Sequence, residues 1–339
     1  MTARTAARRR RGYTAHDIAF REPHARPGRS RLCAYVLVAP QSVAASGILP
    51  GMPIYSDLAA LLNDVAGRVD SWTRQEAWEP EPGSPGAAEL ANTEIRADGS
   101  PWGERPTRTV FQLGQMQMKM VVEYARSAAL LVAAERTPPA IEVETRAALE
   151  AASVTWWLFE PGLAARERVC RLQLLRRNSA RELARSIAEV GADPAAAGGE
   201  TIPAIEAYGH SLGLASFGQG GDELEGQIRP RYTARVKDLT TELGYLGGYS
   251  IYSGVAHAEL AGVWRLFGET ATTVPDRQPI HSPVPNPEAS HAATDGVLKA
   301  LMAPAERTAF LFGWPSPGLA DEYSATIDRI NTEITHLKP

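Results

Sequence analysis

Cysteine, long apolar runs and an excess of one charge are all scarce in this sequence. Only Cys33 and Cys170 occur in 339 residues, which excludes a disulfide framework and fits a reducing cytoplasm. No apolar run approaches the roughly 20 residues that span a bilayer, so we expect no membrane partner. The net charge of -4 gives no global attraction to nucleic acid. We therefore expect a cytoplasmic globular protein.

Runs of alternating β-branched residues are also scarce, and Tyr35 to Val38 is the one short strand candidate. Helical spacing of apolar residues, by contrast, recurs along the chain. This pattern predicts an all-α protein, a bundle of about six or seven long helices with no substantial sheet. The expected helices cover 54–72, 110–135, 141–159, 163–190, 231–243, 245–267, 289–312 and 319–337, with a short one near 203–209.

Three regions are expected. Residues 1–50 form a flexible basic N-terminal arm, in which Arg8 to Arg11 make a basic run. An alternative for this arm is a secretory signal, because an apolar run, Leu32 to Val38, follows the basic residues. Residues 51–109 hold the first helix and then a linker or surface loop rich in proline and glycine. Residues 110–339 form the main helical bundle.

The stretch from Tyr245 to Phe267 is predicted to be a buried helix with a polar line on one face. Tyr249, Ser253 and His257 are four residues apart, so they share one side of a helix. A histidine with neighbouring hydroxyls can act as a base, a ligand or a proton donor, and these three residues are the candidate catalytic group. The alternative is a structural histidine that bonds to a carboxylate on another helix.

A ligand-binding group is expected on the preceding helices. Arg146 and Glu150 lie one turn apart near an apolar Trp-Trp end, and Arg171 lies on the next helix one turn after Glu167. Such pairs are commonly solvated ion pairs, but burial is plausible beside the tryptophans. If Glu150 faced His257 across the bundle, each group would fix the charge of the other.

Other chemistry has weaker support. The run GHSLG places Ser211 in the G-x-S-x-G pattern of hydrolases, with Asp238 and His257 as conceivable partners, but that pattern needs a strand before the serine. No Walker A sequence occurs, and neither cysteine has metal-ligand spacing, so we predict no cofactor and no metal. The arginine-rich run at 163–190 makes nucleic acid an alternative partner; interspersed glutamates favour a solvated face of mixed charge.

Three runs carry a resemblance: ETRAALEAASVTWWLFEP, AARERVCRLQLLRRNSARELA and YSIYSGVAHAEL. They resemble uncharacterised all-helical proteins of actinobacteria, which are in turn similar to HEPN-like bundles. The resemblance spans about residues 110–270 and implies a homodimer. HEPN ribonucleases use an arginine a few residues before a histidine on one helix. Here Tyr252 and Ser253 stand in that place, and Arg265 follows His257.

We therefore expect a helical binding or regulatory module for a protein or small-molecule ligand, in stress or defence. The alternatives are a HEPN-like ribonuclease with an altered signature and a serine hydrolase that uses Ser211.

Overall fold

The structure is a computed structural model, and it describes residues 53–74, 78–135, 138–192, 201–245, 248–257 and 287–315, with 323–325, 327–328 and 332. Backbone contacts divide the chain into two units, residues 1–33 and 34–339, and every described residue belongs to the second. The predicted N-terminal arm, the strand candidate at 35–38 and most of the helix expected at 319–337 lie outside the described residues.

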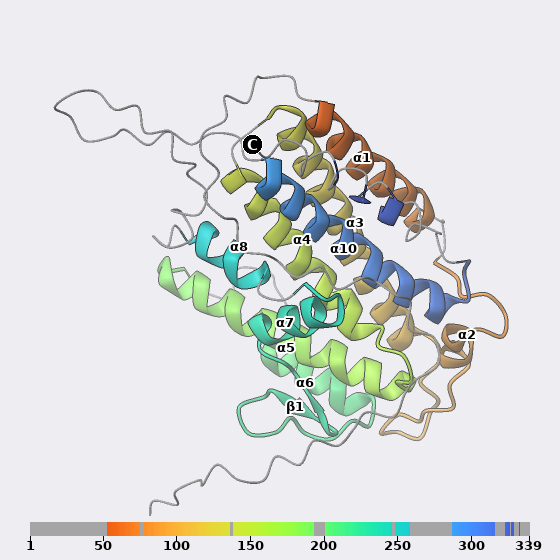
Figure 1. The fold of residues 1–339 in the computed structure, drawn as a ribbon. Coiled ribbons are helices and arrows are strands. Elements are labelled where there is room, and N and C mark those ends of the chain that lie inside the picture. The colour runs from red at the N-terminus through yellow and green to blue at the C-terminus, as the bar shows by residue number, and fades with distance from the viewer. Residues whose placement is uncertain are drawn as a thin grey trace, which may run out of the picture. The chain divides into compact units, whose positions relative to one another are not determined.

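The predicted all-α class is confirmed (Figure 1). In the described ranges no helix is long and apolar enough to cross a membrane. The helices are α1 (Pro53–Thr73), α2 (Pro85–Leu90), α3 (Arg105–Ala133), α4 (Pro138–Leu158), α5 (Ala165–Glu189), α6 (Ile202–Ser211), α7 (Tyr232–Glu242), α8 (Gly248–Ala256) and α10 (Pro287–Phe312).

Helix α4 is at the centre of the bundle and packs against α3, α10, α8 and α7. Helix α1 packs against α3 and α10. Apolar residues at helical spacing explain this packing, since each helix turns one stripe inward. On α3 the stripe includes Val110, Met118, Val121 and Val132, each with no exposed surface. The core is therefore one continuous cluster shared by these helices.

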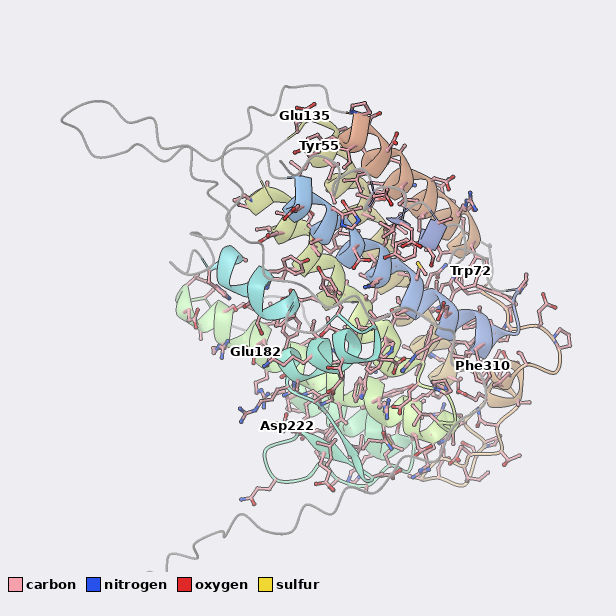
Figure 2. The ribbon with its side chains drawn as sticks, viewed as in Figure 1. Tyr55, Trp72, Glu135, Glu182, Asp222 and Phe310 are labelled. Atoms are coloured by element: carbon pink, nitrogen blue, oxygen red, sulfur yellow. The ribbon has the colours of Figure 1, made fainter. Side chains whose placement is uncertain are left out.

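An aromatic cluster closes one end of the bundle. Trp72, labelled in Figure 2, packs edge-on against Trp314 with ring centroids 5.0 Å apart. Trp78 packs edge-on against both Trp314 and Phe312, and Phe312 lies 4.8 Å from Phe111. Edge-to-face pairs of this kind add roughly 0.5–1.5 kcal/mol beyond the area that they bury. The cluster therefore ties α1, α3 and α10 together through their aromatic ends.

The segment expected to be a linker, residues 78–109, differs from that prediction. It contains α2 and the start of α3, and Trp78 and Trp102 are 4% and 2% exposed. The Trp102 indole donates to the Leu212 carbonyl at 2.8 Å. Proline and glycine do mark turns here, but the tryptophans between them anchor the segment to the bundle. Residue 110 is accordingly no boundary, because α1 packs directly on α3.

The described sheet is a single antiparallel hairpin, β1 (Glu223–Leu224) and β2 (Gln227–Ile228). It packs on α5, and α6 packs on α5 as well. The hairpin turn needs left-handed backbone at Glu225 and Gly226. The Glu225 side chain turns back to α5, where it accepts from Arg166 Nε at 2.7 Å. The hairpin is thus fixed to α5 by a charged pair.

The helix predicted at 245–267 is observed over part of its length. α8 covers Gly248–Ala256, and His257 follows as an exposed turn residue. Tyr249 and Tyr252 are buried, each 3% exposed, whereas residues 258–267 lie outside the described residues. The polar line therefore runs from a buried tyrosine to an exposed histidine, and His257 is not the core residue that was expected.

Candidate functional site

Arg146 joins the two groups of residues that the sequence singled out. Its Nε donates to Glu150 Oε1 at 2.8 Å, one turn further along α4. Its Nη1 lies 3.2 Å from His257 Nε2, beyond the end of α8. A guanidinium has only donors, so Nε2 is the acceptor in this contact. Arg146 thereby places Glu150 and His257 on opposite sides of one cation.

Tyr249 completes the link between α8 and α4. Its hydroxyl donates to Glu150 Oε1 at 3.2 Å, and the Arg146 guanidinium lies 5.9 Å from the centre of its ring. Burial, and then the Glu150 carboxylate, raises the pKa of Tyr249 above its ordinary value. The phenol therefore stays protonated and remains a donor to Glu150.

Ser253 contributes through its backbone. Its carbonyl accepts from the His257 amide at 3.0 Å, a helical bond that ties His257 to the last turn of α8. Of the six predicted site residues, the structure brings together Arg146, Glu150, Tyr249 and His257, with Ser253 behind them. Their roles in catalysis or binding stay predictions.

Tyr232 and Arg235 of α7 also lie beside α4 near Glu150, and the sequence did not identify them as site residues. Burial, followed by the Glu150 carboxylate, raises the pKa of Tyr232 far above its ordinary value. Arg235, one turn later on α7, is 4% exposed; its Nε donates to Ser153 Oγ at 3.0 Å. Burial lowers the pKa of Arg235 to about 10. Both residues start the helix that packs beside Glu150, and nothing in their spacing revealed that contact.

An open hollow of about 570 Å³ lies beside this network, between α3, α4 and the start of α7. Its lining is mostly apolar. The lining residues are Met116, Gln117, Lys119, Met120 and Tyr124 of α3, Ala147, Glu150 and Ala151 of α4, and Tyr232 of α7. Glu150 therefore belongs both to the hollow and to the network with Arg146, Tyr249 and His257.

Met116 and Met120 continue the apolar helical spacing of residues 110–135, which predicts burial, and this prediction is wrong. They are 63% and 44% exposed, whereas Met118 on the opposite side of α3 is fully buried. Helical spacing identified an apolar side of α3 correctly but did not show that the helices described by the structure leave it uncovered at this point. Exposed methionines are adaptable contact residues, because the thioether is flexible and polarisable.

Arg171 lies apart from this site. Its Nη1 donates to the Trp157 carbonyl at 2.6 Å and pairs with Glu160 at 2.7 Å, and its guanidinium lies 4.8 Å from the centre of the Trp157 ring. The side chain is 10% exposed, and burial lowers its pKa. These contacts fasten α5 to the end of α4, so we assign Arg171 a structural role.

The other arginines of α5 are also engaged within the molecule. Glu182 and Asp222 are labelled in Figure 2. Glu182 accepts from Arg185, and Asp222 lies 3.6 Å from Arg181. Ion pairs also join Arg166 to Glu225 and Glu94, Arg168 to Glu89, and Arg177 to Glu206. Arg176 lies over the Tyr208 ring, 5.3 Å from its centre. A nucleic-acid track would need charges that these partners already neutralise.

The serine hydrolase alternative loses its structural premise. Residues 202–211 form α6, a helix, where a nucleophile elbow needs a strand. The Ser211 hydroxyl donates to the Tyr208 carbonyl at 2.7 Å, as is usual for a serine in the last turn of a helix. In the part of the chain that the structure describes, no group of three or more His, Cys, Asp or Glu could hold a metal ion.

The sequence matches no protein-family model, no curated protein and no solved structure.

Proposed function

We propose that this protein is a helical binding module whose small-molecule ligand occupies the hollow between α3, α4 and α7. The position of Glu150 carries the proposal, because this carboxylate lines the hollow while Arg146 and Tyr249 hold it in place. Ligand sites commonly combine apolar walls with a few fixed polar groups in roughly 300–1,000 Å³. The hollow has that size and that composition.

A regulatory role has a physical route. A ligand that bonds to Glu150 would change the ion pair between Glu150 and Arg146. Through Arg146 it would also change the contact with His257 at the exposed end of α8. Such a response would suit the stress or defence role that the resemblance implies. The two cysteines in 339 residues support a cytoplasmic location.

The test is a fragment screen read on the methionine methyl groups by NMR, which is practical with six methionines. We expect ligands to shift the Met116 and Met120 signals, while buried Met118 on the same helix serves as the internal control. Ala147→Phe, which fills the hollow from α4, should abolish the shifts and leave the melting temperature nearly unchanged. Fragments that bind while leaving Met116 and Met120 unmoved would place the site elsewhere and refute the proposal.

A second candidate function is RNA cleavage, and the 3.2 Å contact between Arg146 and His257 favours it. An imidazole beside a guanidinium is a plausible base next to an anion-binding group. His257→Ala and Arg146→Gln should each remove cleavage of single-stranded RNA, whereas His210→Ala, at an exposed position on α6, should not. Equal activity in all three variants would assign the cleavage to a contaminant.

Light scattering would test the homodimer that the resemblance implies.

A further inference from the structure

The walls of the hollow offer surfaces that suit a cation. Tyr124 and Tyr232 contribute two aromatic rings, and Met116 and Met120 contribute two exposed thioethers. Aromatic faces attract cations through the ring quadrupole, and thioether sulfur is polarisable. An apolar body with a positive group would therefore contact favourable surface on several sides.

The acidic groups of α4 supply the matching charge. Glu150 lines the hollow, and its side chain is 20% exposed. Oε1 accepts from Arg146 and Tyr249, and the carboxylate also bonds to the Tyr232 side chain. A carboxylate offers about four acceptor positions, so one remains for a ligand. Glu144 lies one turn before Ala147 on the same side of α4. It is half-buried, and burial raises its pKa.

Lys119 also lines the hollow, and its ammonium would repel a cationic ligand that came close to it. Its side chain is exposed, so the methylene stem can line the hollow while the ammonium stays in water. Arg235 is buried against Ser153 and does not line the hollow, although its guanidinium lies 5.6 Å from the centre of the Tyr232 ring. Tyr124 is therefore the ring with no such cation over it among these contacts. An anionic ligand would instead be placed against Glu150, at a cost in repulsion.

We propose that the hollow binds an organic cation with an apolar body, its positive group at Glu150 and its apolar part against Met116 and Met120. This inference rests on the proposed function and adds the chemical class of the ligand. The cation donates to Glu150 at the acceptor position that Arg146, Tyr249 and Tyr232 leave open. Glu144 does not line the hollow, but it adds a second negative charge on the same side of α4 as Ala147.

Three probes of equal length test the class with the full chain. They are 4-phenylbutylammonium, 4-phenylbutanol and 4-phenylbutyrate, which differ only in the head group. Dissociation constants come from titration of the Met116 and Met120 methyl signals. We expect the ammonium to bind about tenfold more tightly than the alcohol, as a charge-assisted hydrogen bond would give, and the carboxylate to bind most weakly.

Two variants locate the charge. Glu150→Gln should weaken the ammonium about tenfold and leave the alcohol within about twofold, since only the cation depends on the carboxylate charge. Glu144→Gln, which leaves the Arg146 pair intact, should weaken the ammonium in the same direction. Glu223→Gln, at an exposed position of the hairpin that does not line the hollow, is the control and should change nothing.

The outcomes separate the two proposals. If the alcohol or the carboxylate binds as tightly as the ammonium, or neither Glu150→Gln nor Glu144→Gln weakens the ammonium, the cation class is refuted and the ligand site stands. If none of the three probes moves Met116 or Met120, both the class and the proposed site fall.

Discussion

His291 is a residue whose protonation opposes folding. It lies on α10 with its Nε2 buried, and burial lowers its pKa below 6.5, although Asp295 acts in the other direction. The unfolded chain therefore takes up the proton first as the pH falls. Stability attributable to His291 is complete above about pH 6.5 and is lost progressively below it.

We accordingly expect His291→Gln to flatten the pH dependence of stability. Between pH 7.5 and pH 5.5 the natural chain should lose more unfolding free energy than the variant, because its unfolded state takes up a proton that the folded state resists. Urea denaturation at several pH values measures both. Parallel curves for the two proteins would mean that His291 is protonated as easily in the fold as in water.

At the level of elements, one buried ion pair joins three helices. Arg168 of α5 is 1% exposed and donates to Glu89 of α2 at 2.8 Å and to the Leu158 carbonyl, at the end of α4, at 2.6 Å. Burial raises the pKa of Glu89 and Arg168 opposes that shift, so the carboxylate needs its partner to stay charged. Removing one member leaves a charge in the core without its counter-charge.

Glu89→Ala should therefore cost about 3–5 kcal/mol of unfolding free energy. The double variant Arg168→Met, Glu89→Leu should cost less than Glu89→Ala alone, because no buried charge remains. Glu79→Ala is the matched control: its pair with Arg108 is solvent-accessible and worth roughly 0–1 kcal/mol. Additive costs for the two members of the buried pair, measured by chemical denaturation, would show that Arg168 and Glu89 do not depend on each other.

The helices also show which features of the fold and of the site could be predicted from the sequence. Apolar residues at helical spacing predicted α1, α3, α4, α5, α7 and α10 to within a few residues, because burial of one stripe decides both the helix and its extent. The sequence also indicated Arg146, Glu150, Tyr249 and His257. It could not indicate that Arg146 of α4 would contact His257 just after α8. That contact depends on how α8 docks against α4.

What a stripe cannot reveal is whether another helix covers it. Met116 and Met120 continue the apolar spacing of α3, yet they open onto the hollow. The opposite error concerns residues 78–109, where turn-forming residues hid two buried tryptophans. Arg171 was expected at a ligand site and instead fastens α5 to Trp157. In each case the deciding fact is a contact between segments distant in sequence.

Across the whole described unit, α10 completes the core from the far end of the chain. It packs against α4, α3, α1 and α2, and its residues Val297, Leu298, Leu301, Leu311 and Phe312 are fully buried. Burying each such side chain is worth roughly 1.5–3 kcal/mol. Their sum is comparable to the roughly 5–15 kcal/mol of net stability of a whole domain. The site on α4 thus depends on α10, although no residue of α10 lines the hollow.

A chain that ends at residue 286 should therefore lack a cooperative fold. We expect it to keep part of its helical circular dichroism, to melt without a sharp transition and to bind 8-anilinonaphthalene-1-sulfonate, as collapsed chains without fixed packing do. Adding residues 287–339 as a separate polypeptide should restore the transition. A sharp melt of the shortened chain alone would show that the other helices form a core without α10.

Two adjacent residues of α10 separate loss of packing from loss of helix. Phe310, labelled in Figure 2, is 55% exposed, and Leu311 has no exposed surface. Both changes to alanine favour the helix itself slightly, so only packing distinguishes them. Leu311→Ala should cost about 2–5 kcal/mol. Phe310→Ala should stay within about 0.5 kcal/mol, as exposed substitutions do. Equal losses in chemical denaturation would contradict the docking of α10 through its Leu311 side.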